Sequence, residues 1–353
     1  MVVCVGSGGV GKTTMSAALA VRGAHLGRRV LVLTVDPARR LATALGLDEA
    51  TPTESGIEHT VPLVKPKGSL RAAVIDSKKV FDEFIRKHSK EASVVERIMR
   101  NRLYQQMSTT LSGSQEFTAL ERLLQGAESD QFDLVILDTP PTKHAMDFLS
   151  APQRIQDLFQ DAITKWFMGS EEKPKGLFAN IVGRGPKTVL KSLEVLTGGQ
   201  FIEELVDFFT AVRSIQVVLR ERSAAAAELL NDPKTAFIVV TSFDAAKLLE
   251  AKQLGMNLRS RNYSLQGVII NRAFPLWLPE TVESGKAGDE SRAKVLKFFE
   301  EFRKYYAVRY NLYEEFEKSL GGAAKVVRVP EYREDVHGLS DLVDLANVLG
   351  QEG

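Results

Sequence analysis

Short apolar runs recur along the chain and alternate with longer stretches of helical periodicity. The strand candidates lie at residues 2–5, 30–35, 70–75, 132–137, 236–240, 267–270 and 325–329. Continuous apolar runs are typical of strands buried on both faces of a parallel sheet, and such strands are joined by crossover helices. The pattern therefore predicts an α/β fold with a mostly parallel central sheet flanked by helices.

A long part of the chain departs from this alternation. Residues 147–232 carry no strand signal, and their apolar positions recur at helical spacing over 155–167 and 201–215. Residues 80–127 are also mostly helical in pattern. We therefore expect two parts, a sheet core and an inserted helical subdomain. The core comprises residues 1–79, 128–146 and 233–353, and the subdomain comprises residues 80–127 and 147–232.

An aromatic helix is predicted between the last two strand candidates. Residues 292–320 carry a stripe of phenylalanine and tyrosine side chains at helical spacing. Such a stripe is more often core than ligand site, so we expect it to pack against the sheet.

The first strand candidate runs directly into a glycine-rich loop, Gly6 to Thr13, with the sequence GSGGVGKT. The loop fits the pattern G-x-x-x-x-G-K-[ST], and a helix-like stretch follows it. Strand, loop and helix in this order form the context that a phosphate-binding loop requires. Its glycines let backbone N–H groups turn toward phosphate oxygens, and the helix start adds a partial positive charge.

The side chains at the end of this loop have separate expected roles. Lys12 would reach the β- and γ-phosphates of a nucleotide, and the Thr13 hydroxyl would bind Mg²⁺. The predicted nucleotide-binding residues of the loop are Gly8, Gly9, Val10, Gly11, Lys12, Thr13 and Thr14. The chain is therefore predicted to bind a nucleotide together with Mg²⁺.

Two predicted strands end in aspartate. Asp36 follows residues 30–35, and Asp138 follows residues 132–137. Open α/β sheets bind ligands at the carboxyl ends of their strands, so both side chains are expected beside the loop. A hydrophobic strand ending in Asp is the Walker B pattern, whose carboxylate holds Mg²⁺ directly or through water. Together with the loop, this pattern predicts Asp138 and Thr13 as metal ligands.

Composition limits the other function classes. The 46 basic and 45 acidic residues balance, so no nucleic-acid partner is expected. The single cysteine, Cys4, excludes an intrachain disulfide and a Cys-rich metal site and predicts a cytoplasmic protein. The chain enters its first strand at once, so no signal peptide is expected. No apolar stretch has the length of a membrane span, so contact with a membrane would go through a partner or client.

Several motifs, in this order and spacing, carry a resemblance to a known family. They are the glycine loop, VDPARRL, DTPPTKH, VIINR and VPEYREDVHG. With these motifs the chain resembles the ArsA-type ATPases, which comprise the arsenite-pump ATPase and the factors that target tail-anchored membrane proteins. The resemblance covers residues 2 to about 345 and is that of a single-unit, bacterial-like member. It implies a P-loop ATPase with a deviant Walker A loop that works as a nucleotide-gated dimer.

The resemblance also implies roles for individual residues. Asp36 falls on the switch I aspartate that orients the attacking water, so Asp36 and Lys12 are the expected catalytic residues. Asp138 falls on the switch II acid. Asn271 falls on the asparagine that recognises adenine, and Pro330 opens the segment that forms the loop around the base. An asparagine side chain offers a donor and an acceptor, which suit the polar edge of adenine.

The chain departs from the family pattern at Ser7. The family's signature lysine stands at this position, five residues before Lys12, and reaches the partner subunit's nucleotide. A homodimer or a heterodimer is expected, and a related subunit that retains the lysine is one way to restore the charge. Arg39 or Arg40 is another, although both arginines can equally be solvent-exposed or paired with surface acids.

Cysteine content narrows the function further. Residues 274–291 match the region in which eukaryotic targeting members hold a dimer zinc with a Cys-x-x-Cys pair, and they contain no cysteine. No zinc is therefore expected. Arsenite, a soft metalloid, needs several thiols, so a metalloid pump subunit is disfavoured.

Two functions from different classes remain. The first is an ATPase that binds or targets a hydrophobic or membrane-protein client through a groove between apolar helices of the subdomain. Those apolar faces can equally be buried inside the subdomain or at the dimer contact. The second is a regulatory ATPase switch that controls a membrane or transporter partner.

Overall fold

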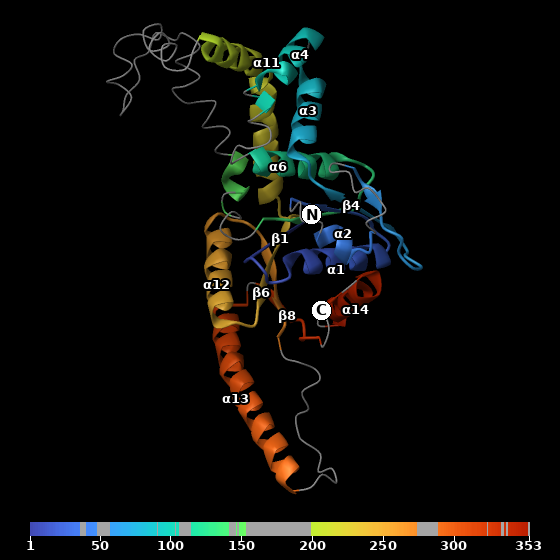
Figure 1. The fold of residues 1–353 in the computed structure, drawn as a ribbon, viewed down its shortest axis with the longest axis vertical. Coiled ribbons are helices and arrows are strands. Elements are labelled where there is room, and N and C mark those ends of the chain that lie inside the picture. Colours follow the sequence, from blue (N-terminus) through green and yellow to red (C-terminus); the bar gives the residue numbers. More distant parts are fainter. Residues whose placement is uncertain are drawn as a thin grey trace, which may run out of the picture. The chain divides into compact units, whose positions relative to one another are not determined.

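The computed structural model is shown in Figure 1. It describes residues 1–35, 40–47, 57–89, 91–102, 104–105, 114–140, 146, 148–152, 199–273, 289–322, 324–332, 335–336 and 338–351. Backbone contacts divide the chain into two compact units, which are described separately. The first comprises Met1–Val74, Gly126–Ala145 and Leu230–Gly353, and the second comprises Ile75–Gln125 and Met146–Leu229.

An eight-stranded sheet forms the centre of the first unit in the part of the chain that is described. The strands, in sheet order, are β3 (His59–Thr60), β4 (Ser69–Val74), β2 (Arg29–Thr34), β5 (Leu134–Asp138), β1 (Val2–Gly6), β6 (Ala236–Ser242), β7 (Leu265–Asn271) and β8 (Lys325–Arg328). Neighbouring strands pair in parallel except β3 with β4. The predicted fold class, a mostly parallel sheet flanked by helices, is confirmed. The hydrophobic pattern did not predict β3, because a pair of residues at a sheet edge has no periodicity.

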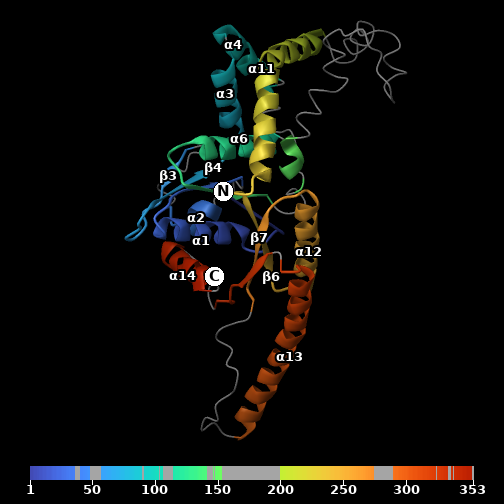
Figure 2. The same ribbon diagram turned by 180° about the vertical axis from the view of Figure 1, so that it is seen from behind.

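Helices cover the sheet on both sides. Figures 1 and 2 show α1 (Lys12–His25), α2 (Arg40–Ala44) and α14 (Gly338–Gln351) together on one side, and α12 (Ala245–Ser260) on the other. Alternate residues of the central strands, such as Cys4, Val32 and Ile136, are fully buried against α1 and α14. Because both faces of the sheet are covered, the central strands carry buried apolar residues on both faces, as in the run from Val30 to Leu33 of β2.

The aromatic helix α13 (Asp289–Ser319) meets the expected packing only near its C-terminal end. Tyr313 and Phe316 are each 5% exposed, whereas Phe298 is 63% and Tyr305 is 51% exposed. A helix of 31 residues is about 46 Å long, roughly twice the length of the longest strand here. The N-terminal half of α13 therefore runs past the sheet, and the prediction that the aromatic stripe packs on the sheet is wrong for this half.

Within the described residues, the second unit contains helices and their connections but no strand. Its helices are α3 (Ser77–His88), α4 (Ala92–Arg100), α6 (Ser114–Glu128) and α11 (Gly199–Asn231), the last two of which run on into the first unit. A core cluster within this unit contains Phe84, Ile85, Ile98, Tyr104, Phe117, Ile215 and Leu219. The expected helix at 155–167 lies outside the described residues. The domain bounds given above therefore stay a prediction, and so does the client groove.

A buried ion pair holds two helices of this unit together. Both carboxylate oxygens of Glu121 on α6 accept from Arg222 on α11, at 2.9 Å from Nε and 3.0 Å from Nη2. The Glu121 side chain is 1% exposed and that of Arg222 is 16% exposed. Gln125 also donates to Glu121 at 3.1 Å. A carboxylate this deeply buried depends on its partners, because an unpaired charge in the interior is costly.

We predict that Arg222→Met destabilises this unit by about 3 kcal/mol, because Glu121 keeps its burial and loses its cation. Urea unfolding followed by circular dichroism measures the change. The matched control is Arg220→Met, since Arg220 is exposed on the same helix. Equal midpoints for the two variants would contradict the importance of the pair.

Candidate nucleotide site

The loop between β1 and α1 needs its glycines for two different reasons. Gly9 and Gly11 have positive φ angles of 78° and 87°, a backbone region that side chains disfavour. Gly6 lies so close to β6 that a Cβ atom would overlap the carbonyl oxygen of Val240. The loop backbone is therefore fixed both by its own turn and by the neighbouring strand.

Asp138 is the meeting point of the predicted phosphate and metal residues. It ends β5 and is 2% exposed. Its Oδ2 accepts from the Thr13 hydroxyl at 2.7 Å and from the Thr34 hydroxyl at 3.0 Å. The Lys12 ammonium lies 3.8 Å from Oδ1. The structure thus brings Lys12, Thr13 and Asp138 together, as expected from the order of motifs.

Sheet register explains this convergence. Asp138 pairs with Cys4 of β1 and with Thr34 of β2, so the ends of three adjacent strands share one edge. Thr34 was not predicted as a site residue. Its signal in the sequence is that it interrupts an otherwise apolar run with a hydroxyl, at the end of the strand.

The oxygen donors at this edge suit Mg²⁺. A hydroxyl and a carboxylate are hard ligands, and Mg²⁺ typically takes one or two of these and completes its shell with water and phosphate oxygens. No group of three or more His, Cys, Asp or Glu side chains that could hold a metal occurs within the described residues. A magnesium site of this kind does not need one, because phosphates supply the other oxygens.

Asn271 lies against the phosphate loop. Its Nδ2 donates to the carbonyl oxygen of Val10 at 2.9 Å, and its Oδ1 accepts from the backbone N–H of Arg272 at 2.9 Å. A Cβ atom on Gly11 would overlap Nδ2. An asparagine amide has a second N–H and a second lone pair, so these contacts leave one donor and one acceptor site for a ligand.

Pro330 stands beside the same strand end. It comes two residues after the end of β8, and the backbone of Val329 between them is hydrogen-bonded to β7 and to the segment that follows β7. Val329 donates to Ile270 at 2.9 Å, and Ala273 donates to Val329 at 2.8 Å. Pro330 and Asn271 are thus on adjacent strand ends, and their proposed adenine contacts remain predictions.

The segment after Asp138 is fastened to β1. The Thr139 hydroxyl donates to the backbone carbonyl of Cys4 at 2.8 Å. Cys4 itself is fully buried, and burial raises the pKa of its thiol to about 12. The thiol therefore stays protonated inside the sheet, where it fills core volume next to the loop.

Of the remaining predicted site residues, the structure describes only Arg40. Asp36 and Arg39 lie outside the described residues. So do residues 274–288, most of the cysteine-free region for which we predict that no zinc is bound. Arg40 is the first residue of α2 and is exposed. Its role as a substitute cation stays a prediction.

The sequence model of the anion-transporting ATPase family, also called ArsA ATPase, matches residues 1–351. The chain belongs to this family. Curated relatives include the protein named ATPase GET3 of Mycosarcoma maydis, which is 25% identical over 346 residues. These residues are 98% of this chain and 88% of that relative. The predicted family membership is confirmed.

Two further relatives have similar sequence identities and cover similar shares of the chain. ATPase get3 of Aspergillus niger is 24% identical over 348 residues, which are 98% of this chain and 88% of the relative. ATPase GET3 of Paracoccidioides lutzii is 25% identical over 347 residues, with the same two shares. The protein is therefore an ATPase that binds ATP, as predicted.

We predict that Cys4 resists alkylation by iodoacetamide in the native protein at about pH 8, because only an exposed thiolate reacts. The same protein unfolded in urea should be labelled fully under those conditions, as measured by mass spectrometry. Rapid labelling of the native protein would show that β1 opens readily, contrary to the buried position of Cys4.

Proposed function

We propose that this ATPase couples its nucleotide state to the conformation of a dimer, and that the dimer binds or targets a hydrophobic or membrane-protein client. The observation that carries the switch is the contact of Asp138 with Thr13. A carboxylate that touches a metal-binding hydroxyl must adjust when Mg²⁺ and phosphate enter or leave. Since Thr139 is the next residue in the chain, a shift of Asp138 would pass directly to the segment that follows it.

In this proposal Thr13 and Asp138 hold Mg²⁺, Asp138 directly or through water. Lys12 neutralises charge that develops on the β- and γ-phosphates, together with backbone N–H groups of Gly8, Gly9, Val10, Gly11 and Thr14. Phosphoryl transfer is promoted mainly by positioning and charge neutralisation, which this arrangement supports. Asp36 orients the attacking water.

Asn271 and Pro330 provide the base-side contacts. The free N–H of the Asn271 amide and its remaining lone pair match the polar edge of adenine. Because Nδ2 already donates to Val10, base binding and the shape of the phosphate loop are linked through one side chain. This link supports a preference for an adenine nucleotide.

The magnesium sites, the dimer, the client and the cytoplasmic location all belong to this proposal. No helix within the described residues is long and apolar enough to cross a bilayer. A membrane protein therefore enters the proposal as a client rather than as a part of the chain described. The family contains targeting factors, and the relatives' name, ATPase GET3, supports this direction.

We predict that Lys12→Ala lowers ATP turnover by at least about 100-fold, because the loop loses the charge that faces the phosphates. Asp138→Asn should lower turnover mainly by weakening the response to added Mg²⁺. Phosphate release measured over a Mg²⁺ titration separates the two effects. Full activity of Lys12→Ala would overturn the assignment of the site.

We predict that Asp36→Asn, loaded with ATP and Mg²⁺, retains a test protein that ends in a transmembrane helix. Blocked hydrolysis should hold the client-binding state, so the test protein stays soluble and copurifies. Lys12→Ala is the control that should not retain it. Failure of capture, combined with nucleotide-dependent binding of a soluble or transporter partner, would favour the regulatory switch instead.

A further inference from the structure

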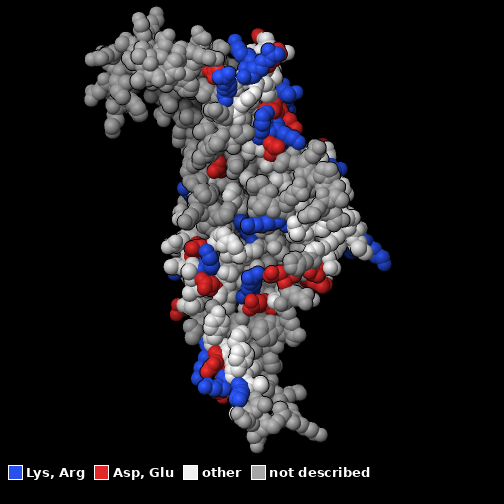
Figure 3. Space-filling view, in the orientation of Figure 1, with Lys and Arg blue, Asp and Glu red and all other residues white. Residues whose placement is uncertain are grey.

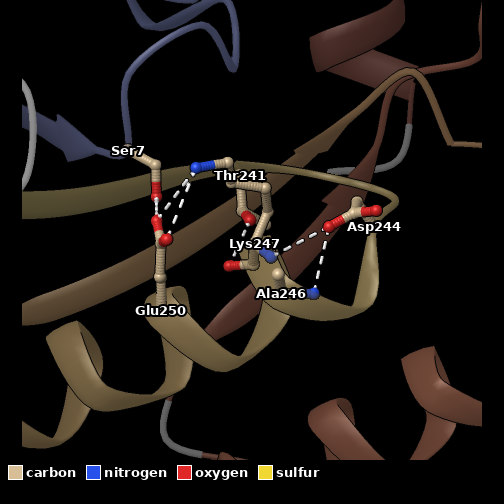
Figure 4. Close-up of polar contacts among 6 residues, drawn as sticks. All are labelled: Ser7, Thr241, Asp244, Ala246, Lys247 and Glu250. Atoms are coloured by element: carbon tan, nitrogen blue, oxygen red, sulfur yellow. Dashed lines mark hydrogen bonds and ion pairs between the residues drawn. The ribbon is translucent and has the colours of Figure 1, made fainter.

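A carboxylate from α12 contacts the phosphate loop at Ser7. Figure 4 shows the Ser7 hydroxyl donating to Glu250 Oε2, with the Lys247 ammonium beside Ser7 and facing the same carboxylate. Lys247 Nζ lies 3.2 Å from Oε2 and 3.4 Å from Oε1. Ser7 itself is 4% exposed and is the first residue after β1.

The first turn of α12 is firmly anchored, so it holds Lys247 in place. Asp244 caps the helix by accepting from the backbone N–H groups of Ala246 and Lys247, at 3.0 and 3.3 Å. The Thr241 hydroxyl donates to the backbone carbonyl of Lys247 at 2.9 Å. These contacts involve the backbone of Lys247, so they survive replacement of its side chain.

The Ser7 hydroxyl and the Lys247 ammonium together form a pair of donors for one anion. In this structure the anion is the carboxylate of Glu250, which accepts from both. A phosphate oxygen, like a carboxylate oxygen, can accept hydrogen bonds from a hydroxyl and from an ammonium at the same time. The Glu250 side chain is 45% exposed, so it can swing into water without crossing the core.

Charge makes an exchange of anions reasonable. A triphosphate carries several negative charges, and the loop from Gly6 to Thr13 contains one cationic side chain, Lys12. That cation already lies 3.8 Å from Asp138. A second cation beside Ser7 would neutralise negative charge of the triphosphate that Lys12 alone leaves unbalanced.

We propose that Lys247 is a phosphate-binding residue of this ATPase. In the absence of phosphate, the Glu250 carboxylate occupies the position that the phosphate would take. The Ser7 hydroxyl and the Lys247 ammonium then bind a nucleotide phosphate, and Glu250 turns to solvent. Lys247 thus brings from α12 the charge that the loop lacks at Ser7. This proposal rests on the nucleotide site proposed above.

The test uses two substitutions with opposite expected signs. Lys247→Ala should lower ATP turnover about tenfold or more and weaken the binding of a fluorescent ATP analogue. Glu250→Gln should tighten binding of that analogue, because it removes the competing anion and leaves both donors in place. Lys247→Arg should recover most of the turnover. If the three residues only stiffened the fold, both Lys247→Ala and Glu250→Gln would weaken binding.

The matched control is Lys252→Ala, since Lys252 is exposed on the same helix. Equal turnover and equal affinity for Lys247→Ala and Lys252→Ala would overturn the proposal. Thermal unfolding of each variant checks that the fold is retained. If Lys12→Ala abolishes nucleotide binding while Lys247→Ala behaves like the control, this inference fails and the nucleotide site stands.

The phosphate can belong to the nucleotide of the same copy or to that of a second copy. Mixing Lys12→Ala with Lys247→Ala subunits separates these sources. Recovery of turnover in the mixture means that an intact Lys247 serves the nucleotide bound by the other copy. A mixture that stays as slow as Lys247→Ala alone means that Lys247 serves its own nucleotide.

Discussion

Burial of the Asp138 carboxylate is the constraint on which the rest of the nucleotide site depends. A carboxylate taken out of water must find hydrogen-bond donors, and here they come from Thr13 at the start of α1 and Thr34 at the end of β2. The Lys12 ammonium adds charge compensation. These groups come from the start of α1, from the end of β2 and from the end of β5, so one carboxylate joins the three elements.

The phosphate loop is also confined by its neighbours on the other side. Gly6 has no room for a side chain against Val240, and Gly11 has none against Asn271. The glycine pattern of the motif is therefore explained by close backbone approach as much as by turn geometry. As a result the loop and the start of α1 contact β6, β7 and β5 through Val240, Asn271 and Asp138.

Two pairs of opposite charges lie beside the phosphate loop, one on each of two sides. Lys12 and Asp138 oppose each other on the side of α1 and β5, while Lys247 and Glu250 oppose each other on the side of α12. Ser7 is neutral, but its hydroxyl connects the loop to the second pair. In the proposal that Lys247 binds phosphate, the arriving anion competes with the Glu250 carboxylate for the Ser7 hydroxyl and the Lys247 ammonium.

The sequence by itself determined the parallel sheet, the phosphate loop and the family, because apolar strands and the glycine motif are local patterns with strong physical meaning. It also marked Asp138 and Asn271 as strand-end side chains, although their roles remain predictions. It did not identify Thr34, Glu250 or Lys247, since a hydroxyl near the end of a strand and an acid–base pair on a helix are common patterns that do not by themselves indicate a site. It also misplaced the exposed half of α13, because periodicity gives the face of a helix but not the extent of the surface it meets. Only the tertiary structure decided these points, since sheet register and helix packing set which distant side chains share an edge.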